Sequence, residues 1–308
     1  MTRAASTAFK VSASAQASLT RPIGVHAPTA GGIGTRPLRY LETTGAECVQ
    51  VFVSNPRGWS LPAPNPKQDE AFRAGCEERG VPAYVHATLL INLASPTPQT
   101  VEQSIRNLEH ALRRGAALGA SGVVFHAGSA VREEFYPAAL KQLRTVLLPL
   151  LDAAAEHGWP RLLVEPSAGG GRSVAATVQA LGPYLETVDF HPWLGVCLDT
   201  CHAWAAGHDL ATPGGMTATL DALVATVGAD RLALIHANDS KDPLGSTRDR
   251  HENIGRGQIG STAFAELMRH PATAGVPIIV ETPAETDGAG HAADVATLKR
   301  LREGSEVG

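Results

Sequence analysis

Short apolar runs alternate with longer, helix-periodic segments from residue 21 onward. Each run is nearly continuous, which favours a strand buried on both faces over a half-exposed one. Eight such runs occur, at residues 22–27, 48–53, 83–87, 122–126, 161–165, 194–199, 232–238 and 277–281. Helices are expected between them, among others at residues 100–118, 137–157, 173–185, 216–227 and 292–302.

This alternation predicts an α/β fold in which helices cover a parallel sheet. Eight strand–helix units are the number that closes a (β/α)8 TIM barrel, so we expect one such domain over residues 21–308. The carboxyl ends of all strands in such a barrel lie on one face. Polar residues at these ends will therefore be neighbours in space although they are far apart in sequence.

A histidine or an acid ends each of the last six runs. These residues recur every 34 to 45 positions and are His86, His126, Glu165, Asp199, His236 and Glu281. A buried carboxylate needs a counter-charge, and a metal ion would supply one to Glu165 and Glu281. Three further candidates, His202, Asp249 and His251, lie in the loops that follow.

The nine candidates are five histidines and four carboxylates. A single histidine at a strand end is more often a hydrogen-bonded loop residue than a ligand, but nine candidates on one predicted face favour a metal site. Histidine and carboxylate without cysteine favour Zn, Mn or Fe over Ca or Mg. Because one zinc ion uses about four ligands, two or three ions are expected.

Composition narrows the class of protein. Of 308 residues, 44% are hydrophobic and 18% are charged, which is typical of a globular chain with a substantial core. The formal net charge is −4, so no basic excess indicates a nucleic-acid binder, although divalent ions would attract phosphate locally. No run reaches the ~18 apolar residues of a membrane span. The four cysteines lack disulfide or zinc-knuckle spacing, which favours a reducing compartment.

Residues 1–20 are rich in Ala, Ser and Thr and contain no acid. This composition predicts a flexible N-terminal extension and favours it over an organellar targeting peptide. No sustained apolar segment indicates a secretory signal. We therefore expect a monomer in a bacterial-type cytoplasm, with no membrane partner.

Motifs around the candidates are more specific than the candidates themselves. They read HATLLINL at 86–93, HAGS at 126–129, CLDTCHA at 197–203, HANDSK at 236–241, DRHENIG at 249–255 and ETP at 281–283. From about residue 23 to residue 301 the chain thereby resembles the endonuclease IV family of apurinic/apyrimidinic endonucleases. The resemblance implies a TIM barrel with three zinc ions that flips out an abasic nucleotide of duplex DNA. It also implies hydrolysis of the phosphodiester on the 5′ side of that nucleotide, leaving a 3′-OH, as in base excision repair.

The resemblance also implies roles for individual residues. One ion would be held by His86, His126 and Glu165. Glu165 would be shared with a second ion, held also by Asp199, His236 and Glu281. The third ion would be held by His202, Asp249 and His251. Glu165 and Glu281 would be the catalytic carboxylates, and manganese would be possible in place of zinc.

Positions that handle DNA depart from the family pattern more than the metal positions do. The loop after the second run keeps Asn55 and Arg57, which we expect to contact DNA. Leu89 stands where the best-known members have an inserting aromatic residue, and we expect it to act as an apolar wedge between base steps. The other departures are Ser54, Pro56, Ala130, Pro166 and Arg256. Together they leave the substrate preference open.

Two other functions fit part of the pattern. Sugar isomerases and epimerases of the xylose-isomerase-like barrel group hold one or two ions with about two Glu, one Asp and one His. They lack the set His202, Asp249 and His251, so about three ions per chain would favour the nuclease. A barrel stapled by zinc that only binds damaged DNA is the third hypothesis, although a packed barrel of this length needs no staple.

Overall fold

The computed structural model describes residues 20–284 and 287–304. The extension predicted at residues 1–20 lies outside these ranges, apart from Thr20. Eight parallel strands close into a barrel in the order β1-β10-β7-β6-β5-β4-β3-β2. They are β1 Ile23–His26, β2 Val49–Phe52, β3 Ala83–His86, β4 Gly122–His126, β5 Arg161–Glu165, β6 Leu194–Asp199, β7 Leu232–His236 and β10 Ile278–Val280. The predicted barrel is confirmed, and each strand lies within the run predicted for it.

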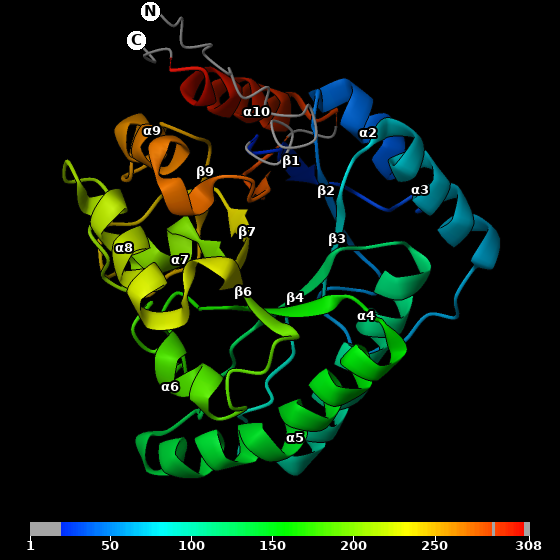
Figure 1. The fold of residues 1–308 in the computed structure, drawn as a ribbon, viewed down its shortest axis with the longest axis vertical. Coiled ribbons are helices and arrows are strands. Elements are labelled where there is room, and N and C mark those ends of the chain that lie inside the picture. The colour runs from blue at the N-terminus through cyan, green and yellow to red at the C-terminus, as the bar shows by residue number, and fades with distance from the viewer. Residues whose placement is uncertain (1–19, 285–286, 305–308) are drawn as a thin grey trace, which may run out of the picture.

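Helices surround the barrel (Figure 1). They are α2 Arg36–Thr44, α3 Pro66–Arg79, α4 Pro98–Ala117, α5 Tyr136–His157, α6 Leu181–Glu186, α7 Thr200–Ala205, α8 Gly215–Val227, α9 Ser261–Arg269 and α10 Ala289–Arg302. Helix α4 shows why they form where they do: its buried residues Val101, Leu108, Ala111 and Leu112 recur at helical spacing. None of the helices in the described ranges combines the length and apolar character that a membrane span requires.

The helix predicted over residues 173–185 is wrong in its first half, because only Leu181–Glu186 is part of an α-helix. The preceding segment makes its backbone hydrogen bonds with neighbouring loops instead. Val174 N donates to the Gly128 carbonyl at 3.0 Å, and Ala175 O accepts from Ser167 N at 3.1 Å. Val174 and Ala175 are buried, and from sequence alone their burial could not be distinguished from that of a helix face.

An apolar layer fills the interior of the barrel. It consists of Cys48, which directly precedes β2, and of one buried residue from each of six further strands: Tyr84, Val124, Leu163, Cys197, Leu234 and Ile279. The remaining strand contributes Gly24, where a Cβ would clash with the carbonyl oxygen of Cys48. Side chains alternate along a strand, so the residue two positions later faces the same interior nearer the carboxyl end. The apolar layer is therefore the floor beneath the layer of residues at the carboxyl ends of the strands.

Candidate metal centre

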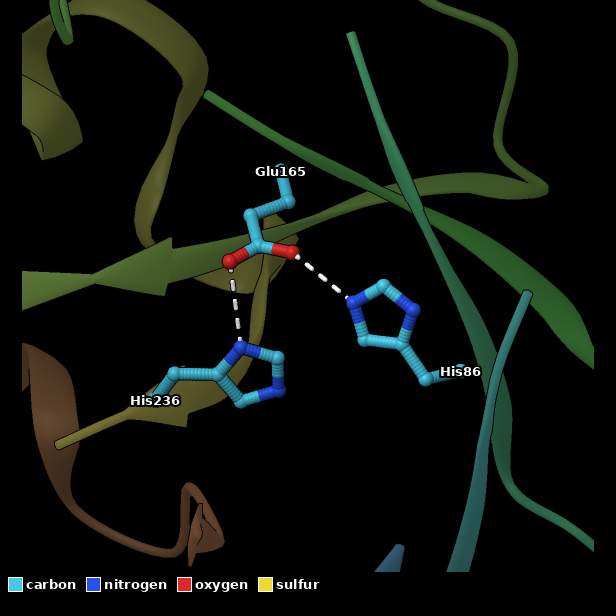
Figure 2. Close-up of side chains that lie close together, drawn as sticks. All are labelled: His86, Glu165 and His236. Carbon is cyan, nitrogen blue, oxygen red and sulfur yellow. Dashed lines mark hydrogen bonds and ion pairs between the residues drawn. The ribbon is translucent and has the colours of Figure 1, made fainter. Parts of the chain in front are cut away.

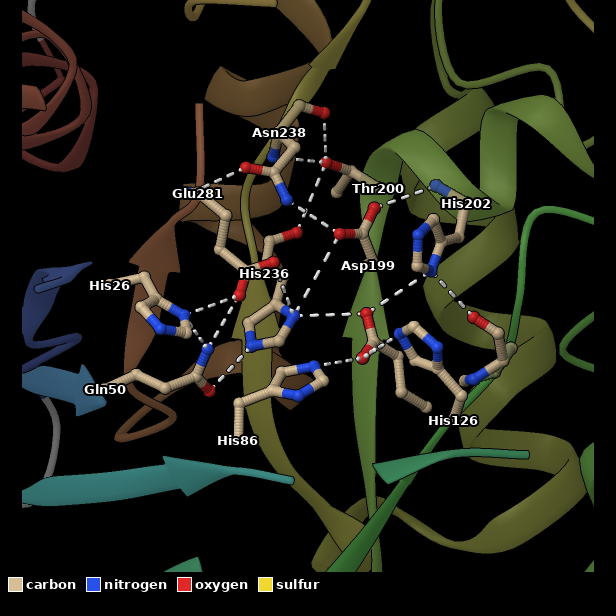
Figure 3. A network of polar contacts seen from close by, with 12 residues as sticks. His26, Gln50, His86, His126, Asp199, Thr200, His202, His236, Asn238 and Glu281 are labelled. Atoms are coloured by element: carbon tan, nitrogen blue, oxygen red, sulfur yellow. Dashed lines mark hydrogen bonds and ion pairs between the residues drawn. The ribbon is translucent and has the colours of Figure 1, made fainter. Parts of the chain in front are cut away.

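A polar layer lies directly above this floor, at the carboxyl ends of the strands (Figure 3). Each member follows a floor residue by two positions: His26, Gln50, His86, His126, Glu165, Asp199, His236 and Glu281. The structure thus brings together all six strand-end residues predicted from the sequence. It adds His26 and Gln50 from the first two strands. The two-residue alternation above Gly24 and Cys48 is the signal that would have identified them.

Glu165 lies at the centre of the layer and is 1% exposed. Four imidazoles contact its carboxylate: His86 Nε2 at 3.2 Å, His126 Nε2 at 3.4 Å, His236 Nδ1 at 3.1 Å and His202 Nδ1 at 3.3 Å. Figure 2 shows two of them, His86 and His236, on opposite oxygens of the carboxylate. Burial alone would raise the pKa of Glu165, but the imidazoles, His236 foremost, hold it well below its usual value. This carboxylate is therefore ionised at neutral pH.

A second group of ligand atoms surrounds the Nδ1 atom of His236. Donor atoms of Glu165, Asp199, His236 and Glu281 all lie within 4.8 Å of one another. His236 Nδ1 is 3.2 Å from Glu281 Oε2 and 4.0 Å from Asp199 Oδ2. Burial would raise the pKa of Glu281, but the charge of His236 and a hydrogen bond from His26 lower it. Three carboxylates and one imidazole thus converge on one point.

A third group consists of His202, Asp249 and His251. Asp249 bridges the two imidazoles: its Oδ2 is 3.2 Å from His202 Nε2, and its Oδ1 is 2.9 Å from His251 Nε2. Burial lowers the pKa of His251, but the hydrogen bond to Asp249 and the charge of Asp199 raise it to about 9. Asp249 and His251 belong to a loop that leaves the barrel after β7 and folds into a small hairpin, β8 Asp239–Ser240 with β9 His251–Glu252.

Local hydrogen bonds explain why Asp199 and His202 face the same centre. Asp199 is the N-cap of α7, and its Oδ1 accepts from His202 N at 2.8 Å. The cap places His202 in the first turn of the helix. Asn238 holds the other side, because its amide nitrogen donates to Asp199 Oδ2 at 2.7 Å and its amide oxygen accepts from Glu281 N at 2.8 Å. Asn238 therefore ties the ends of β6, β7 and β10 together.

Asp239 anchors the loop that follows the hairpin. It is fully buried, and its carboxylate accepts five backbone N–H groups. The donors are Ser240 at 2.8 Å, Gly255 at 3.0 Å, Gly257 at 3.1 Å, Ile259 at 2.9 Å and Gly260 at 3.2 Å. Asp239 lies in the same motif as His236. Its carboxylate, however, makes its hydrogen bonds with the backbone of its own hairpin and loop. We therefore describe it as a structural residue of the hairpin.

Two of the imidazoles, His86 and His251, are oriented as metal ligands are. His86 Nδ1 donates to the Ala87 carbonyl at 2.7 Å, and His251 Nδ1 donates to the Glu281 carbonyl at 3.1 Å. When such an imidazole is neutral, its other nitrogen presents a lone pair to a carboxylate about one hydrogen-bond length away, and the two repel unless a cation lies between them. Metal-ligating histidines characteristically donate their other N–H to an oxygen acceptor. The donor set and its orientation therefore fit Zn or Mn.

A cavity of about 310 Å³ opens above the three groups, and Leu89 lines it with a side chain that is 42% exposed. Asn55 and Arg57 are exposed on the neighbouring loop, where Asn55 Oδ1 accepts from Arg57 N at 2.9 Å. The two loops are joined, because Leu89 N donates to the Pro56 carbonyl at 2.9 Å. Asn55 lines an adjacent cavity rather than the central one. The three residues predicted to contact DNA thus lie on two connected loops beside the centre.

Comparison with known proteins relates these features to a family. The family model described as a xylose isomerase-like TIM barrel matches residues 38–303. The "Probable endonuclease 4" of Streptomyces coelicolor is 58% identical over 293 residues, which cover 95% of this chain and 99% of that protein. A protein of the same name from Chlorobium phaeobacteroides is 39% identical over 85% of this chain and 92% of its own length.

Solved structures give a consistent picture. The crystal structure of endonuclease IV from Thermus thermophilus superposes with a TM-score of 0.77 at 34% identity, covering 92% of this chain and all of that one. A D-tagatose 3-epimerase-like protein superposes with a TM-score of 0.69 over 92% of this chain and 98% of that chain. Its identity is 16%, so this second likeness concerns the fold alone.

Proposed function

The chain belongs to the endonuclease IV family within the xylose isomerase-like TIM barrels, and we propose that it is a zinc-dependent endonuclease that hydrolyses the phosphodiester 5′ to abasic sites in duplex DNA. The group formed by His202, Asp249 and His251 supports this function most directly. Sugar isomerases of the same fold hold one or two ions with fewer ligands. A third group of ligand atoms is what a nuclease with three ions requires.

We assign the nine candidate residues to three ions. His86 and His126 would hold one ion together with Glu165; Glu165, Asp199, His236 and Glu281 would hold the second; His202, Asp249 and His251 would hold the third. When bound, closely spaced divalent ions activate water near neutral pH and stabilise the charge on both the attacking and the leaving oxygen of an in-line displacement. No side chain of the protein then has to act as a nucleophile.

The two central carboxylates have different surroundings, which suggests different roles. Glu165 is 1% exposed and is enclosed by imidazoles, so its role is to hold the groups together. Both carboxylates line the cavity, but the side chain of Glu281 is 15% exposed. Of the two catalytic carboxylates, Glu281 is therefore the one more accessible to a substrate phosphate. Gln50 and His26 hold its Oε1 at 2.7 Å and 3.0 Å, which leaves Oε2 facing the centre.

The size of the cavity favours a substrate unit that has been rotated out of the duplex. A cavity of about 310 Å³ is at the lower end of the usual size of ligand pockets, which suits a single nucleotide unit better than a stretch of duplex. Enzymes that act on a single nucleotide extrude it and must offset an unstacking cost of a few kcal/mol. Leu89 at the mouth is placed to fill the gap that remains in the stack. Arg57 on the joined loop supplies a cation for the phosphate backbone.

Incubation of the protein with a duplex carrying one abasic site tests this function. We expect cleavage on the 5′ side that leaves an end a polymerase can extend. We also expect its loss on prolonged chelation and its return on adding zinc or manganese. An undamaged duplex and a panel of ketoses are the controls. Glu281→Gln should nearly abolish turnover. Epimerisation of a ketose without cleavage of the duplex, or full cleavage by protein shown to be free of metal, would contradict the assignment.

A further inference from the structure

Gln50 is buried within the centre, and its side-chain amide contacts only residues of the polar layer. It lies on β2, two positions after the floor residue Cys48, and is fully buried. Its Oε1 is 3.0 Å from His236 Nε2, and its Nε2 is 2.7 Å from Glu281 Oε1 and 2.9 Å from His26 Nδ1. We propose that Gln50 is a positioning residue that selects which nitrogen of His236 and which oxygen of Glu281 face the metal. This inference rests on the metal centre proposed above.

The chemistry of the amide determines the orientation of His236. An amide oxygen can only accept a hydrogen bond, so His236 Nε2 must carry the hydrogen and donate it. The other nitrogen, Nδ1, then faces the carboxylates of Glu165 and Glu281 at 3.1 Å and 3.2 Å (Figure 3). If the ring turned over about its Cβ–Cγ bond, its nitrogens would leave these positions. The hydrogen bond to Gln50 opposes that rotation.

The same amide assigns the two oxygens of Glu281. Gln50 Nε2 donates to Oε1, whereas Oε2 is the oxygen beside His236 Nδ1. Reversing the amide would place its oxygen 2.7 Å from a carboxylate oxygen, and the two would repel. One orientation of the amide therefore satisfies His236 and Glu281 together. Asn238 does not duplicate this role, because it binds the backbone N–H of Glu281 and the side chain of Asp199.

Two substitutions at position 50 separate these contributions. Gln50→Met keeps the length of the side chain but removes the amide and its contacts with His236, Glu281 and His26. Gln50→Glu keeps an acceptor for His236 but places a second carboxylate against Glu281. Gln142→Met is the matched control, because it likewise removes an amide that makes two hydrogen bonds. Gln142 donates to the backbone carbonyls of Leu93 at 2.7 Å and Ser95 at 3.0 Å, away from the centre.

Zinc affinity, measured by competition with a chromophoric chelator, is the first readout. Outer-shell partners of metal ligands typically contribute about 10–100-fold to metal affinity. We expect Gln50→Met to weaken the binding of one equivalent of zinc by about that factor. The affinity of the site formed by His202, Asp249 and His251 should stay unchanged. The second readout is the ¹⁵N–¹H signal of His236 Nε2 in zinc-loaded protein. It should exchange slowly in wild type and in Gln50→Glu, and disappear in Gln50→Met.

The possible outcomes distinguish this inference from the proposed function. Wild-type protein that binds no zinc would overturn both. Wild-type protein that binds zinc, with Gln50→Met retaining the same affinity and the same His236 signal, would overturn the role of Gln50 alone. Equal weakening of every zinc equivalent, accompanied by a lower melting temperature of the metal-free protein, would show a merely structural role. If Gln50→Met does not fold, Gln50→Glu tests the inference alone. Either loss of the His236 signal in Gln50→Glu or a zinc affinity equal to that of wild type would overturn the role of Gln50.

Discussion

Replacing Asp239 by Asn is expected to destabilise the fold strongly although it barely changes the shape of the side chain. One oxygen of Asp239 accepts from the backbone of Ser240 and Ile259, and the other accepts from Gly255, Gly257 and Gly260. The single oxygen of Asn can serve only the set of three. Its NH2 group then faces two N–H donors that have no acceptor. A buried donor left without its partner costs about 1–3 kcal/mol, so the two together cost about 2–6 kcal/mol.

Thermal unfolding of the metal-free variant measures this cost. At about 2 °C per kcal/mol for a chain of this size, the melting temperature should fall by about 4–12 °C. Asp209→Asn is the matched control, because exposed Asp209 also accepts from two backbone N–H groups, those of Ala211 at 3.2 Å and Thr212 at 3.1 Å. Both N–H groups donate to one oxygen of Asp209, which Asn retains. The other oxygen accepts only from the Thr212 hydroxyl, and water can replace it there, so the expected cost is below about 1 kcal/mol. If Asp239→Asn and Asp209→Asn have the same melting temperature, the hydrogen bonds of Asp239 do not stabilise the loop as described.

Three further outcomes are expected. Arg57→Ala should weaken binding to abasic duplex and reduce its salt dependence by about one unit of slope with metal content unchanged; an unchanged slope would remove the phosphate contact. Leu89→Tyr should tighten binding to abasic duplex by adding a stacking face, and Leu89→Ala should loosen it, with little effect on an abasic single strand. Equal duplex affinity in both folded variants would refute the wedge. The thiols should resist alkylation in the native protein, since burial raises the pKa of Cys76 to about 11 and of Cys197 and Cys201 to about 12, and all four cysteines are buried; rapid labelling before unfolding would contradict this burial.

The barrel was predictable because its strands carry a strong, local signal. A parallel strand covered on both faces requires a continuous apolar run, and all eight runs contain a strand. Segment 173–180 was not predictable in the same way. Its apolar residues are buried although they are not helical, and its backbone bonds go to the loops after β4 and β5, for example to Gly128, which is distant in sequence. Apolar spacing reports that a residue is buried, but it does not report what buries it.

The candidate ligands were predictable for a related reason. Closure of the barrel brings strand ends together whatever the intervening helices do, and six of the nine candidates stand at strand ends: His86, His126, Glu165, Asp199, His236 and Glu281. The neutral amides of Gln50 and Asn238 carry no metal-ligand signal in the sequence, so their contacts emerged only from the structure. Asp239 shows the opposite case. An aspartate is a common metal ligand, but the carboxylate of Asp239 accepts hydrogen bonds from the backbone of its own loop instead.

The ligands rest on two kinds of backbone, and this difference concerns the lifetime of bound ions. Strand ends such as Glu165 can separate only if the barrel opens, which requires global unfolding. Asp249 and His251 belong to a hairpin whose strands are two residues long, and the carboxylate of Asp249 is 49% exposed. Although Asp239 at the base of the hairpin is buried, the connection at residues 243–250, which carries Asp249, is exposed apart from half-buried Ser246. Segments with few buried contacts open at a small fraction of the global free energy. If the three proposed ions bind, the ion held by Asp249 and His251 would therefore exchange with solution faster than the two held above the barrel floor.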